Sequence, residues 1–417
     1  MSIPVEDAVP LNDLQSMTAE IRPQLDAAWD EVVSSSAFVA GEPLKRFEQQ
    51  WAAHCGTRHA VGVANGTDAI ELTLRALGIG AGDEVIVPAN TFIASVEAVV
   101  LAGATPRFVD VDENTLLLTP AIVKDAITER TAAVIAVSLF GNMPRLDELS
   151  ALAEASKIAL IEDAAQAQGA SWNGRHAGSF GVAGCFSFYP GKNLGAFGDA
   201  GAVVTDDAAL ADAIRVLANH GRPPDAAHIH RVLARNSRLD ALQAAVLGVK
   251  LTRLGSWNAA RRDAVAMYAE LLPADVEMVT VEPQAVSAYH QNVVRLQGRD
   301  AAMDVLSRQG VASQIHYPIP CHLQSPYRMY ANAPLPVVEG AARLILSLPL
   351  FPHITEAQIV RVCRCLNDHL DAFASSRANV SPLRHKPAVA SPPVPDVASA
   401  EREFVSAAKL GSSRSVG

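Results

Sequence analysis

The chain has 417 residues, of which 49% are hydrophobic and 19% charged, and its formal net charge is −10. This composition is typical of a globular protein long enough for two or three domains with sizeable cores. The acidic balance argues against binding to nucleic acid or to an anionic membrane, because both favour clustered Lys and Arg.

The cysteines and the N-terminal residues bear on the cellular compartment. The five cysteines are scattered and odd in number, which does not fit a disulfide framework. The pair Cys363 and Cys365 has no second ligand pair, so we expect reduced thiols and no metal site. Residues 1–15 lack the basic start and apolar core of a signal peptide, and no apolar stretch approaches the roughly 20 residues of a membrane span. We expect a cytoplasmic protein.

In the first half of the chain, apolar runs alternate with amphipathic stretches. Runs rich in Val, Ile and Leu predict strands at 83–88, 105–112, 132–141 and 158–165. Helical spacing of apolar residues predicts helices at 68–78, 94–103, 120–127 and 145–156. Strands that are apolar throughout and separated by helices predict an α/β fold with a mostly parallel sheet between helices. Ligands of such sheets bind beyond the carboxyl ends of the strands.

The second half predicts a smaller α/β domain. A long helix is expected at 238–272, and the segments that follow predict strands at 290–296 and 313–320 and helices at 299–310 and 355–370. We therefore expect a large domain at 1–250 and a small C-terminal domain at 251–374. Residues 375–417 are rich in Ser, Ala and Pro and are predicted to be disordered, because they cannot bury enough apolar surface.

Two charged residues follow predicted strands of the large domain. Asp163 ends the run "IALIED", where an aspartate is either a helix N-cap or a carboxylate facing a ligand. Lys192 lies in "FYPGKNLGAFGDAGAV", between two apolar runs and among four glycines. A lysine usually lies on the solvated surface, but in this recessed setting its pKa can fall, and its amine can act as a nucleophile.

Three further features are candidates for ligand contacts. Asn65-Gly66-Thr67 precedes an amphipathic helix, and helix N-termini bind anions such as phosphate, although a simple capping turn has the same sequence. Ser187 lies five residues before Lys192 and is either a phosphate ligand or a strand serine. Phe92 follows the strand at 83–88 and either offers its ring to a planar ligand or packs in the core.

The combination of these features is more specific than any one of them. A phosphate site, an aromatic ring, an acid and a recessed lysine, in that order along one sheet edge, fit pyridoxal phosphate (PLP). Catalysis with this cofactor needs a lysine for its aldehyde, an acid for its pyridinium nitrogen and an anchor for its phosphate.

The sequence resembles the DegT/DnrJ/EryC1/StrS family of sugar aminotransferases. The matching stretches include "NGTDAIELTLRALGIGAGDEVIVPANTFIAS", "GATPRFVDVD", "IEDAAQAQGA", "FSFYPGKNLGAFGDAGAVVTDD", "RNSRLDALQAAVL" and "IHYPIPCH". They extend from about residue 10 to residue 370. The resemblance implies the fold of type I PLP-dependent transferases, with a large domain and a smaller C-terminal α/β domain.

The resemblance also implies roles for individual residues. Lys192 matches the lysine that binds the cofactor's aldehyde, Asp163 the acid at the pyridine nitrogen, and Gln166 the residue near the phenolic oxygen. The positions that match phosphate ligands are Gly66, Thr67 and Ser187.

Other matching positions concern the neighbouring subunit and the substrate. Asn236 matches an asparagine that reaches the phosphate bound in the neighbouring subunit, which implies a homodimer with shared active sites. Phe92 matches the aromatic residue stacked on the cofactor ring. The stretch near the nucleotide-sugar pocket is matched by His316, Tyr317 and His322.

The implied reaction is transfer of an amino group from L-glutamate to a keto group of a dTDP-, UDP- or GDP-linked deoxy-ketohexose, in amino-sugar biosynthesis. "NSRLDALQAAVL" is more similar to the relatives that aminate carbon 3 than to those that aminate carbon 4. A histidine in place of the lysine is typical of relatives that dehydrate sugars, and Lys192 favours transamination. Two alternatives remain open: amination of a cyclitol ketone such as an inosose, and a regulatory relative that binds PLP without turnover.

Overall fold

The computed structural model describes residues 8–223 and 228–378. The strands are β1 (His59–Val63), β2 (Glu84–Pro88), β3 (Thr105–Val109), β4 (Thr131–Val137), β5 (Ala159–Asp163), β6 (Ser171–Trp172), β7 (Arg175–His176), β8 (Ala183–Ser187), β9 (Gly201–Thr205), β10 (Glu277–Met278), β11 (Ala285–Val286), β12 (Asn292–Arg295) and β13 (Ile345–Leu348). The helices are α1 (Leu14–Glu20), α2 (Arg22–Ser35), α3 (Glu42–Cys55), α4 (Gly66–Ala76), α5 (Ile93–Leu101), α6 (Pro120–Ala126), α7 (Leu146–Ser156), α8 (Ala208–Ala218), α9 (Ala241–Leu271), α10 (Arg299–Arg308), α11 (Pro336–Ala341) and α12 (Glu356–Ala378).

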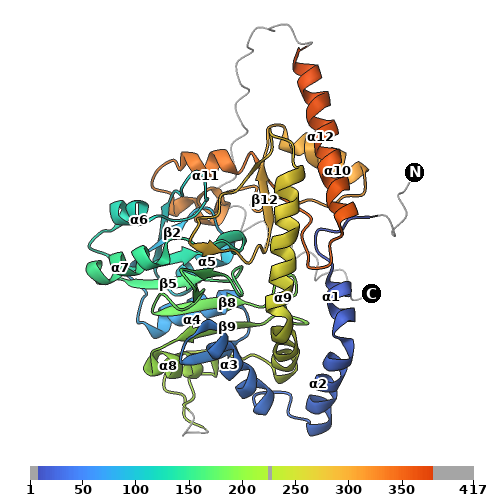
Figure 1. Cartoon of the computed structure of the whole chain (residues 1–417). Coiled ribbons are helices and arrows are strands. Elements are labelled where there is room, and N and C mark those ends of the chain that lie inside the picture. Colours follow the sequence, from blue (N-terminus) through green and yellow to red (C-terminus); the bar gives the residue numbers. More distant parts are fainter. Residues whose placement is uncertain (1–7, 224–227, 379–417) are drawn as a thin grey trace, which may run out of the picture.

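A seven-stranded sheet forms the centre of the molecule (Figure 1). Its strand order is β1-β9-β8-β5-β4-β2-β3. From β8 to β3 the neighbouring strands are parallel, and β9 is antiparallel to both β8 and β1. The predicted mostly parallel, mixed sheet is therefore confirmed, as are the four strands and four helices expected in its first part.

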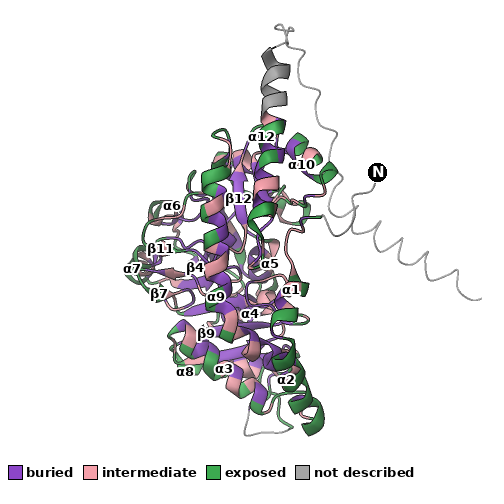
Figure 2. Cartoon of the chain, turned by 45° about the vertical axis from the view of Figure 1, so that its right-hand side comes forward, coloured by how far each residue is buried: buried purple, intermediate pink, exposed green. Residues whose placement is uncertain are grey.

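Both faces of this sheet are buried. Along β2, Val85 and Val87 pack into one hydrophobic cluster with α4, α5 and α8, whereas Ile86 packs into a second cluster with α3, α7 and α9. This alternation follows from the two-residue repeat of a strand, and it explains why the strands are apolar throughout. Figure 2 shows the buried strands inside helices that expose one face.

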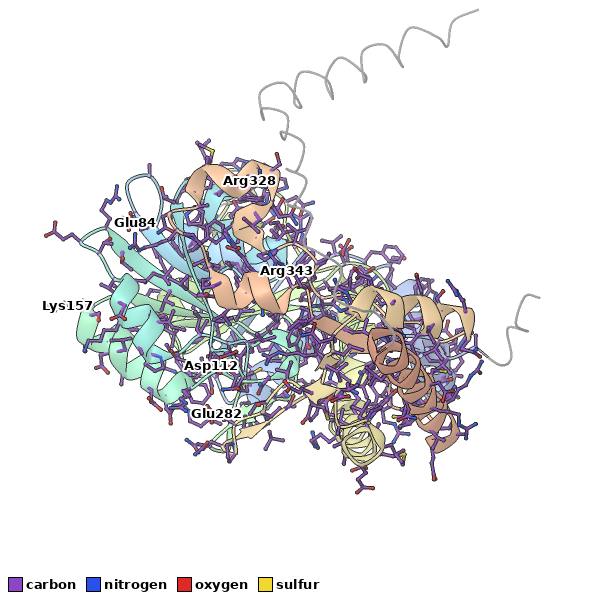
Figure 3. All side chains as sticks on the ribbon, turned by 90° about the horizontal axis from the view of Figure 1, so that it is seen from above. Glu84, Asp112, Lys157, Glu282, Arg328 and Arg343 are labelled. Atoms are coloured by element: carbon purple, nitrogen blue, oxygen red, sulfur yellow. The ribbon has the colours of Figure 1, made fainter. Side chains whose placement is uncertain are left out.

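The two ends of the parallel strands differ in character. Glu84 begins β2 and accepts a hydrogen bond from Thr128 (2.7 Å), and Lys157 lies just before β5. Figure 3 shows both at the left-hand edge of the molecule, on the side opposite to α12. The carboxyl ends of β4, β5 and β8 therefore point the opposite way, toward the interior of the molecule.

The C-terminal part contains a second, smaller α/β unit. A three-stranded sheet in the order β10-β12-β13 packs with α10 and α12 around a core that includes Val294, Leu346 and Val362. Helix α9 runs alongside both β8–β9 and β12 (Figure 1), and it passes without a break through the boundary expected at residues 250 and 251. The domain limits stay a prediction. The expected tail at 375–417 lies outside the described residues, except for 375–378, which belong to α12.

The prediction of a strand at 313–320 is wrong. The segment is extended, but it forms one isolated bridge, in which Gln314 and Ser347 exchange backbone hydrogen bonds. Pro318 and Pro320 have no backbone N–H and cannot continue a ladder. The segment remains a loop beside the carboxyl ends of the strands.

Three other expectations concern the cysteines, metals and membranes. All five cysteines are free and buried. In residues 8–223 and 228–378, no group of three or more His, Cys, Asp and Glu side chains is arranged to hold a metal ion. Over the same residues, no helix combines the length and the apolar character of a membrane span.

Candidate active site

A cavity of about 650 Å³ lies at the carboxyl ends of the central strands. Val137, Asp163 and Ser187, the last residues of β4, β5 and β8, all line it. Nine of the predicted site residues meet here, namely Gly66, Thr67, Phe92, Asp163, Gln166, Ser187, Lys192, His316 and Tyr317. They come from segments that are up to 250 residues apart in the sequence, so the fold itself assembles the cavity.

Lys192 lies in the loop between β8 and β9, and its side chain is half-buried. Burial lowers the pKa of Lys192 to about 8, because a low-dielectric surrounding disfavours the ammonium form, while the nearby charge of Asp163 opposes this shift. At pH 7 a pKa of about 8 leaves roughly a tenth of the amine neutral, whereas an exposed lysine is almost fully protonated. The site therefore provides a lysine that can act as a nucleophile or a base.

Asp163 is the buried acid of the cavity. Its carboxylate accepts hydrogen bonds from the Ser95 hydroxyl (2.6 Å) and from the Ala165 backbone N–H (3.2 Å). Burial raises the pKa of Asp163, and these two hydrogen bonds together with the charge of Lys192 oppose the increase. A cationic ring nitrogen beside the carboxylate would favour its ionised form further. Asp163 is therefore a buried carboxyl group that lines the cavity, and it is not a helix cap.

The N-terminus of α4 forms the anion-binding side of the cavity. The side chain of Asn65 caps the helix by accepting a hydrogen bond from the Asp68 N–H (2.8 Å). The first N–H groups of a helix have no intrahelical partner and attract phosphate. A Cβ atom on Gly66 would lie 2.7 Å from Cβ of Ser187, so only glycine allows this approach. Ser187 Oγ accepts from the Tyr189 N–H (3.3 Å) and keeps its own proton to donate.

Gln166, Tyr317 and Phe92 form the aromatic side. Gln166 accepts a hydrogen bond from the Phe140 N–H (2.6 Å) and donates one to the Tyr317 hydroxyl (3.2 Å), which fixes its amide. The Phe92 ring is 52% exposed, and its centroid lies 5.6 Å from that of Tyr317. Phe92 is therefore a cavity-lining ring and not a core phenylalanine.

Two neutral histidines lie near Lys192. His316 forms a hydrogen bond through Nδ1 with Ser347 Oγ (2.7 Å), and burial and the charge of Lys192 lower its pKa to about 4. His290 forms one through Nδ1 with Asn193 Oδ1 (3.1 Å), and burial, followed by nearby cations, lowers its pKa well below the usual value. Both rings can bind polar groups without adding charge to the cavity.

Two predicted residues do not line this cavity. Asn236 is exposed, and its segment pairs with Asn219 through one isolated bridge. His322 is buried beside Phe108, and its Nε2 lies 3.2 Å from Glu339 Oε1. In this chain, then, Asn236 is exposed outside the cavity, and His322 is buried outside it in contact with Glu339.

Sequence reasoning missed Ser95 and His290. Ser95 lies in α5 and has the same local pattern as any small helix residue, so its contact with Asp163, 68 positions away, has no signal in one sequence. His290 precedes β12, and its position beside Lys192 depends on packing of the C-terminal part against the large sheet. A lone histidine is no indication of such a role.

The residues that line the cavity fit PLP. A helix N-terminus and the Ser187 hydroxyl suit a phosphate, the buried Asp163 suits a ring nitrogen, and Lys192 suits an aldehyde. Lys192 is the single lysine or arginine among the described residues that line the cavity.

Known proteins are similar to this chain over most of its length. The chain is 42% identical over 356 residues to a "Pleiotropic regulatory protein" of Geobacillus stearothermophilus, which covers 84% of this chain and 95% of the relative. It is 44% identical over 356 residues to the UDP-N-acetyl-3-dehydro-alpha-D-glucosamine 3-aminotransferase of Acidithiobacillus ferrooxidans, covering 85% and 96%.

A solved structure and a family model extend the likeness. The crystal structure of S. venezuelae DesV in complex with a ketimine intermediate superimposes with a TM-score of 0.84 at 43% identity, covering 87% of this chain and 98% of that one. This confirms the predicted aminotransferase fold. The model of the DegT/DnrJ/EryC1/StrS aminotransferase family matches residues 19–367. The chain therefore belongs to the DegT/DnrJ/EryC1/StrS aminotransferase family.

Proposed function

We propose that this protein is a PLP-dependent aminotransferase that moves an amino group from L-glutamate to carbon 3 of a nucleotide-linked deoxy-ketohexose. The observation that carries the proposal is the meeting of Lys192, Asp163 and the N-terminus of α4 in one cavity. The name of the Acidithiobacillus relative supports a nucleotide sugar and carbon 3. Location in the cytoplasm is part of the same proposal.

Different residues of the cavity would bind different parts of the cofactor. PLP supplies an aldehyde for an amine and a ring that accepts electrons from the carbon next to that amine. Lys192 would hold the aldehyde carbon and Asp163 the proton of the ring nitrogen. The phosphate would lie at the N–H groups of Gly66 and Thr67 and at the Ser187 hydroxyl.

Lys192 also moves the proton of the reaction. With PLP and the amino donor in the cavity, Lys192 Nζ would accept the proton from the donor's alpha carbon. It can do so because burial, which lowers its pKa to about 8, keeps part of the amine neutral. Gln166, held by Phe140 and Tyr317, would orient the phenolic oxygen, and the buried carboxylate of Asp163 would accept a hydrogen bond from the protonated ring nitrogen.

A second subunit would complete the site. The described lining residues offer no arginine for the phosphates of a nucleotide, and Asn236 is exposed outside its own cavity. Leu233, three residues before it, is 90% exposed, which favours a partner that covers this segment. We therefore propose a homodimer in which Asn236 reaches the phosphate bound in the neighbouring subunit.

The activity is tested with a substrate panel. The purified protein, PLP and L-glutamate are combined with 3-keto and 4-keto sugars linked to dTDP, UDP or GDP, and with an inosose, and 2-oxoglutarate formation is measured. We expect turnover with one 3-keto nucleotide sugar. Lys192→Ala should lose turnover and the cofactor's visible absorbance band, because no amine remains to bind the aldehyde, whereas the exposed-residue control Lys45→Ala should keep both.

The other outcomes separate the remaining functions. Turnover of the inosose alone would identify a cyclitol aminotransferase. PLP binding without turnover of any ketone would favour a regulatory protein, an outcome worth including because one relative carries the name of a regulator. A fully active Lys192→Ala variant would contradict the proposal altogether.

A further inference from the structure

Helix α9 contacts the Lys192 loop at three points. Gln243 Oε1 accepts a hydrogen bond from the Phe197 N–H (2.7 Å), Lys250 Nζ donates to the Gly195 carbonyl (2.6 Å), and Asn258 Oδ1 accepts from Asn193 Nδ2 (2.8 Å). Positions 243, 250 and 258 are about two helical turns apart, so they lie on one side of the helix. Three side chains of one helix thus hold residues 193–197, directly after Lys192.

Lys250 is the unusual member of this set. It is 4% exposed, and burial lowers its pKa to about 8. No carboxylate among the described residues forms an ion pair with it, and its contacts are the Gly195 carbonyl and the Phe197 ring, 4.5 Å from Nζ. A buried cation without a counter-ion is unfavourable for folding, so a purely structural reason for this lysine is weak.

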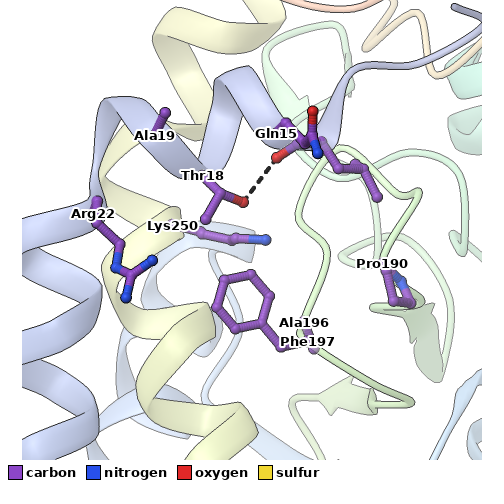
Figure 4. Close-up of a pocket in the computed structure, with 9 residues that line it drawn as sticks. Gln15, Thr18, Ala19, Arg22, Pro190, Ala196, Phe197 and Lys250 are labelled. Carbon is purple, nitrogen blue, oxygen red and sulfur yellow. Dashed lines mark hydrogen bonds between the residues drawn. The ribbon is translucent and has the colours of Figure 1, made fainter.

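Lys250 does not line the cavity that contains Lys192. It lines a second cavity of about 770 Å³ on the other side of the loop, formed with α1 and the start of α2. Figure 4 shows its side chain between Thr18 and the Phe197 ring. Lys250 therefore contacts the Lys192 loop from the side opposite to the cavity that Lys192 lines. It has no direct access to a substrate bound there.

The loop depends on this support because it folds back tightly on itself. A Cβ atom on Gly195 would lie 2.2 Å from the Pro190 carbonyl oxygen, and the Ala196 N–H donates to the Phe188 carbonyl (2.8 Å). The Gly195 carbonyl is thereby turned toward α9, where Lys250 is its hydrogen-bond partner. Glycine has little conformational preference of its own, so the orientation of this peptide group depends on two hydrogen bonds, one from the Ala196 N–H to Phe188 and one from Lys250 to the Gly195 carbonyl.

We propose that Lys250 is a positioning residue for Lys192. Its ammonium group fixes the Gly195 carbonyl and the Phe197 ring, and so holds the loop in the conformation that presents the Lys192 amine to the cavity. This role rests on the proposed function of Lys192. The charge of Asp163, and not that of Lys250, acts on the pKa of Lys192. Lys250 therefore acts on Lys192 through its contacts with the loop.

The test uses the full chain with Lys250→Met, which keeps a long side chain but removes the charge and the donor, and Lys250→Arg, which restores both. Arg22→Met is the matched control, because Arg22 lines the same cavity but pairs with Asp26. Hydrogen–deuterium exchange of peptides that cover 188–200 is measured with and without PLP, together with the PLP dissociation constant, kcat, KM and Tm.

For Lys250→Met we expect about tenfold faster exchange in this loop, about tenfold weaker PLP binding and about tenfold lower kcat, since small misplacements of a reacting group are costly. KM and Tm should change little, because the variant also removes a buried charge. Lys250→Arg should recover part of kcat, and Arg22→Met should resemble the unchanged protein. If Lys250→Met does not fold, Gln243→Leu, which removes a neighbouring contact to the same loop, should increase exchange in the same peptides.

Unchanged loop exchange and unchanged kcat in a folded Lys250→Met protein would overturn the proposal. So would equal changes in all peptides, which would mean general destabilisation. Hydrogen–deuterium exchange and PLP binding are measured without any amino acceptor. Both results can therefore be interpreted even if the proposed reaction does not occur. If the unchanged protein and Arg22→Met also lack turnover, the proposed function is contradicted, and loop exchange and PLP binding of Lys250→Met still decide the role of Lys250.

Discussion

Lys192 and Lys250 show how one residue type serves two purposes in neighbouring cavities. Burial lowers the pKa of each to about 8. Lys192 has the carboxylate of Asp163 nearby and faces the cavity of the cofactor site, whereas Lys250 is bonded to a carbonyl oxygen. A lowered pKa alone therefore does not identify the reactive lysine; its accessible cavity and its partners do.

The lowered pKa of Lys192 leads to a prediction on pH. The neutral amine attacks the aldehyde of PLP, and the ammonium form cannot. In cofactor-free protein, the rate of PLP attachment should rise about tenfold per pH unit below pH 8 and level off above it. Stopped-flow absorbance measures this rate.

The control for this prediction is Asp163→Asn. The charge of Asp163 favours the ammonium form of Lys192, so its removal should shift the break in the pH profile to lower pH. A break near the pKa of an ordinary exposed lysine would show that Lys192 is not buried in solution.

At the residue scale, the sequence was informative where a chemical group has an unusual local setting. Lys192 among glycines and Asp163 at the end of an apolar run could be found in this way, and the family resemblance added Gln166 and Asn236. Ser95, His290 and Lys250 could not be found, because each acts on a residue that is distant in the sequence. A serine or lysine within an amphipathic helix has no pattern that reveals such a contact.

At the scale of elements, the start of α4 depends on Gly66. Gly66→Ala would place a Cβ atom 2.7 Å from Cβ of Ser187, so α4 or β8 must shift. Overpacking of this kind costs about 1–3 kcal/mol of stability. We expect a lower free energy of unfolding and at least tenfold weaker PLP binding, measured by denaturant titration and by absorbance.

Gly255→Ala in α9 is the matched control. A Cβ atom on Gly255 would meet nothing within 4 Å, and alanine favours a helix over glycine by about 0.5–1 kcal/mol. The control should therefore be neutral or slightly stabilising. Equal PLP affinity of Gly66→Ala and the unchanged protein would rule out a phosphate site at this helix start.

The elements that the sequence predicted well are long or strongly apolar. β2, β4 and β5 are continuous apolar runs because both faces of the sheet are buried, and α9 is recognisable by its length of 31 residues. The two-residue strands β6, β7, β10 and β11 were not predicted, because two residues contain no period. The segment at 313–320 was predicted as a strand from its apolar residues, and its two prolines outweighed them.

At the scale of the whole molecule, the proposed sharing of active sites between two subunits leads to a complementation experiment. Lys192→Ala and Asn236→Leu subunits should each be inactive alone as homodimers. A mixed dimer would contain one site with both an intact Lys192 and a partner's Asn236. Random reassociation makes half of the dimers mixed, so mixing should restore about a quarter of the original activity.

Two results bear on this prediction. Lys192→Ala mixed with Asp163→Asn should give no recovery, because both residues line the same cavity of one chain. If Asn236 acts within its own subunit, the first mixture will also stay inactive, and the shared-site proposal is wrong. Size-exclusion chromatography with light scattering would confirm that dimers are present in each mixture.

The pairing of β1 with β9 has a consequence for how the protein acquires its cofactor. The strand before Gly66 and the strand that ends at Ser187 are not neighbours; β9, residues 201–205, lies between them. The proposed phosphate site therefore cannot form until the chain has been synthesised beyond residue 205 and this long-range pairing is complete. A cofactor that binds there recognises only the folded chain, so the cellular supply of PLP shifts the balance between folded protein and chains lost to degradation.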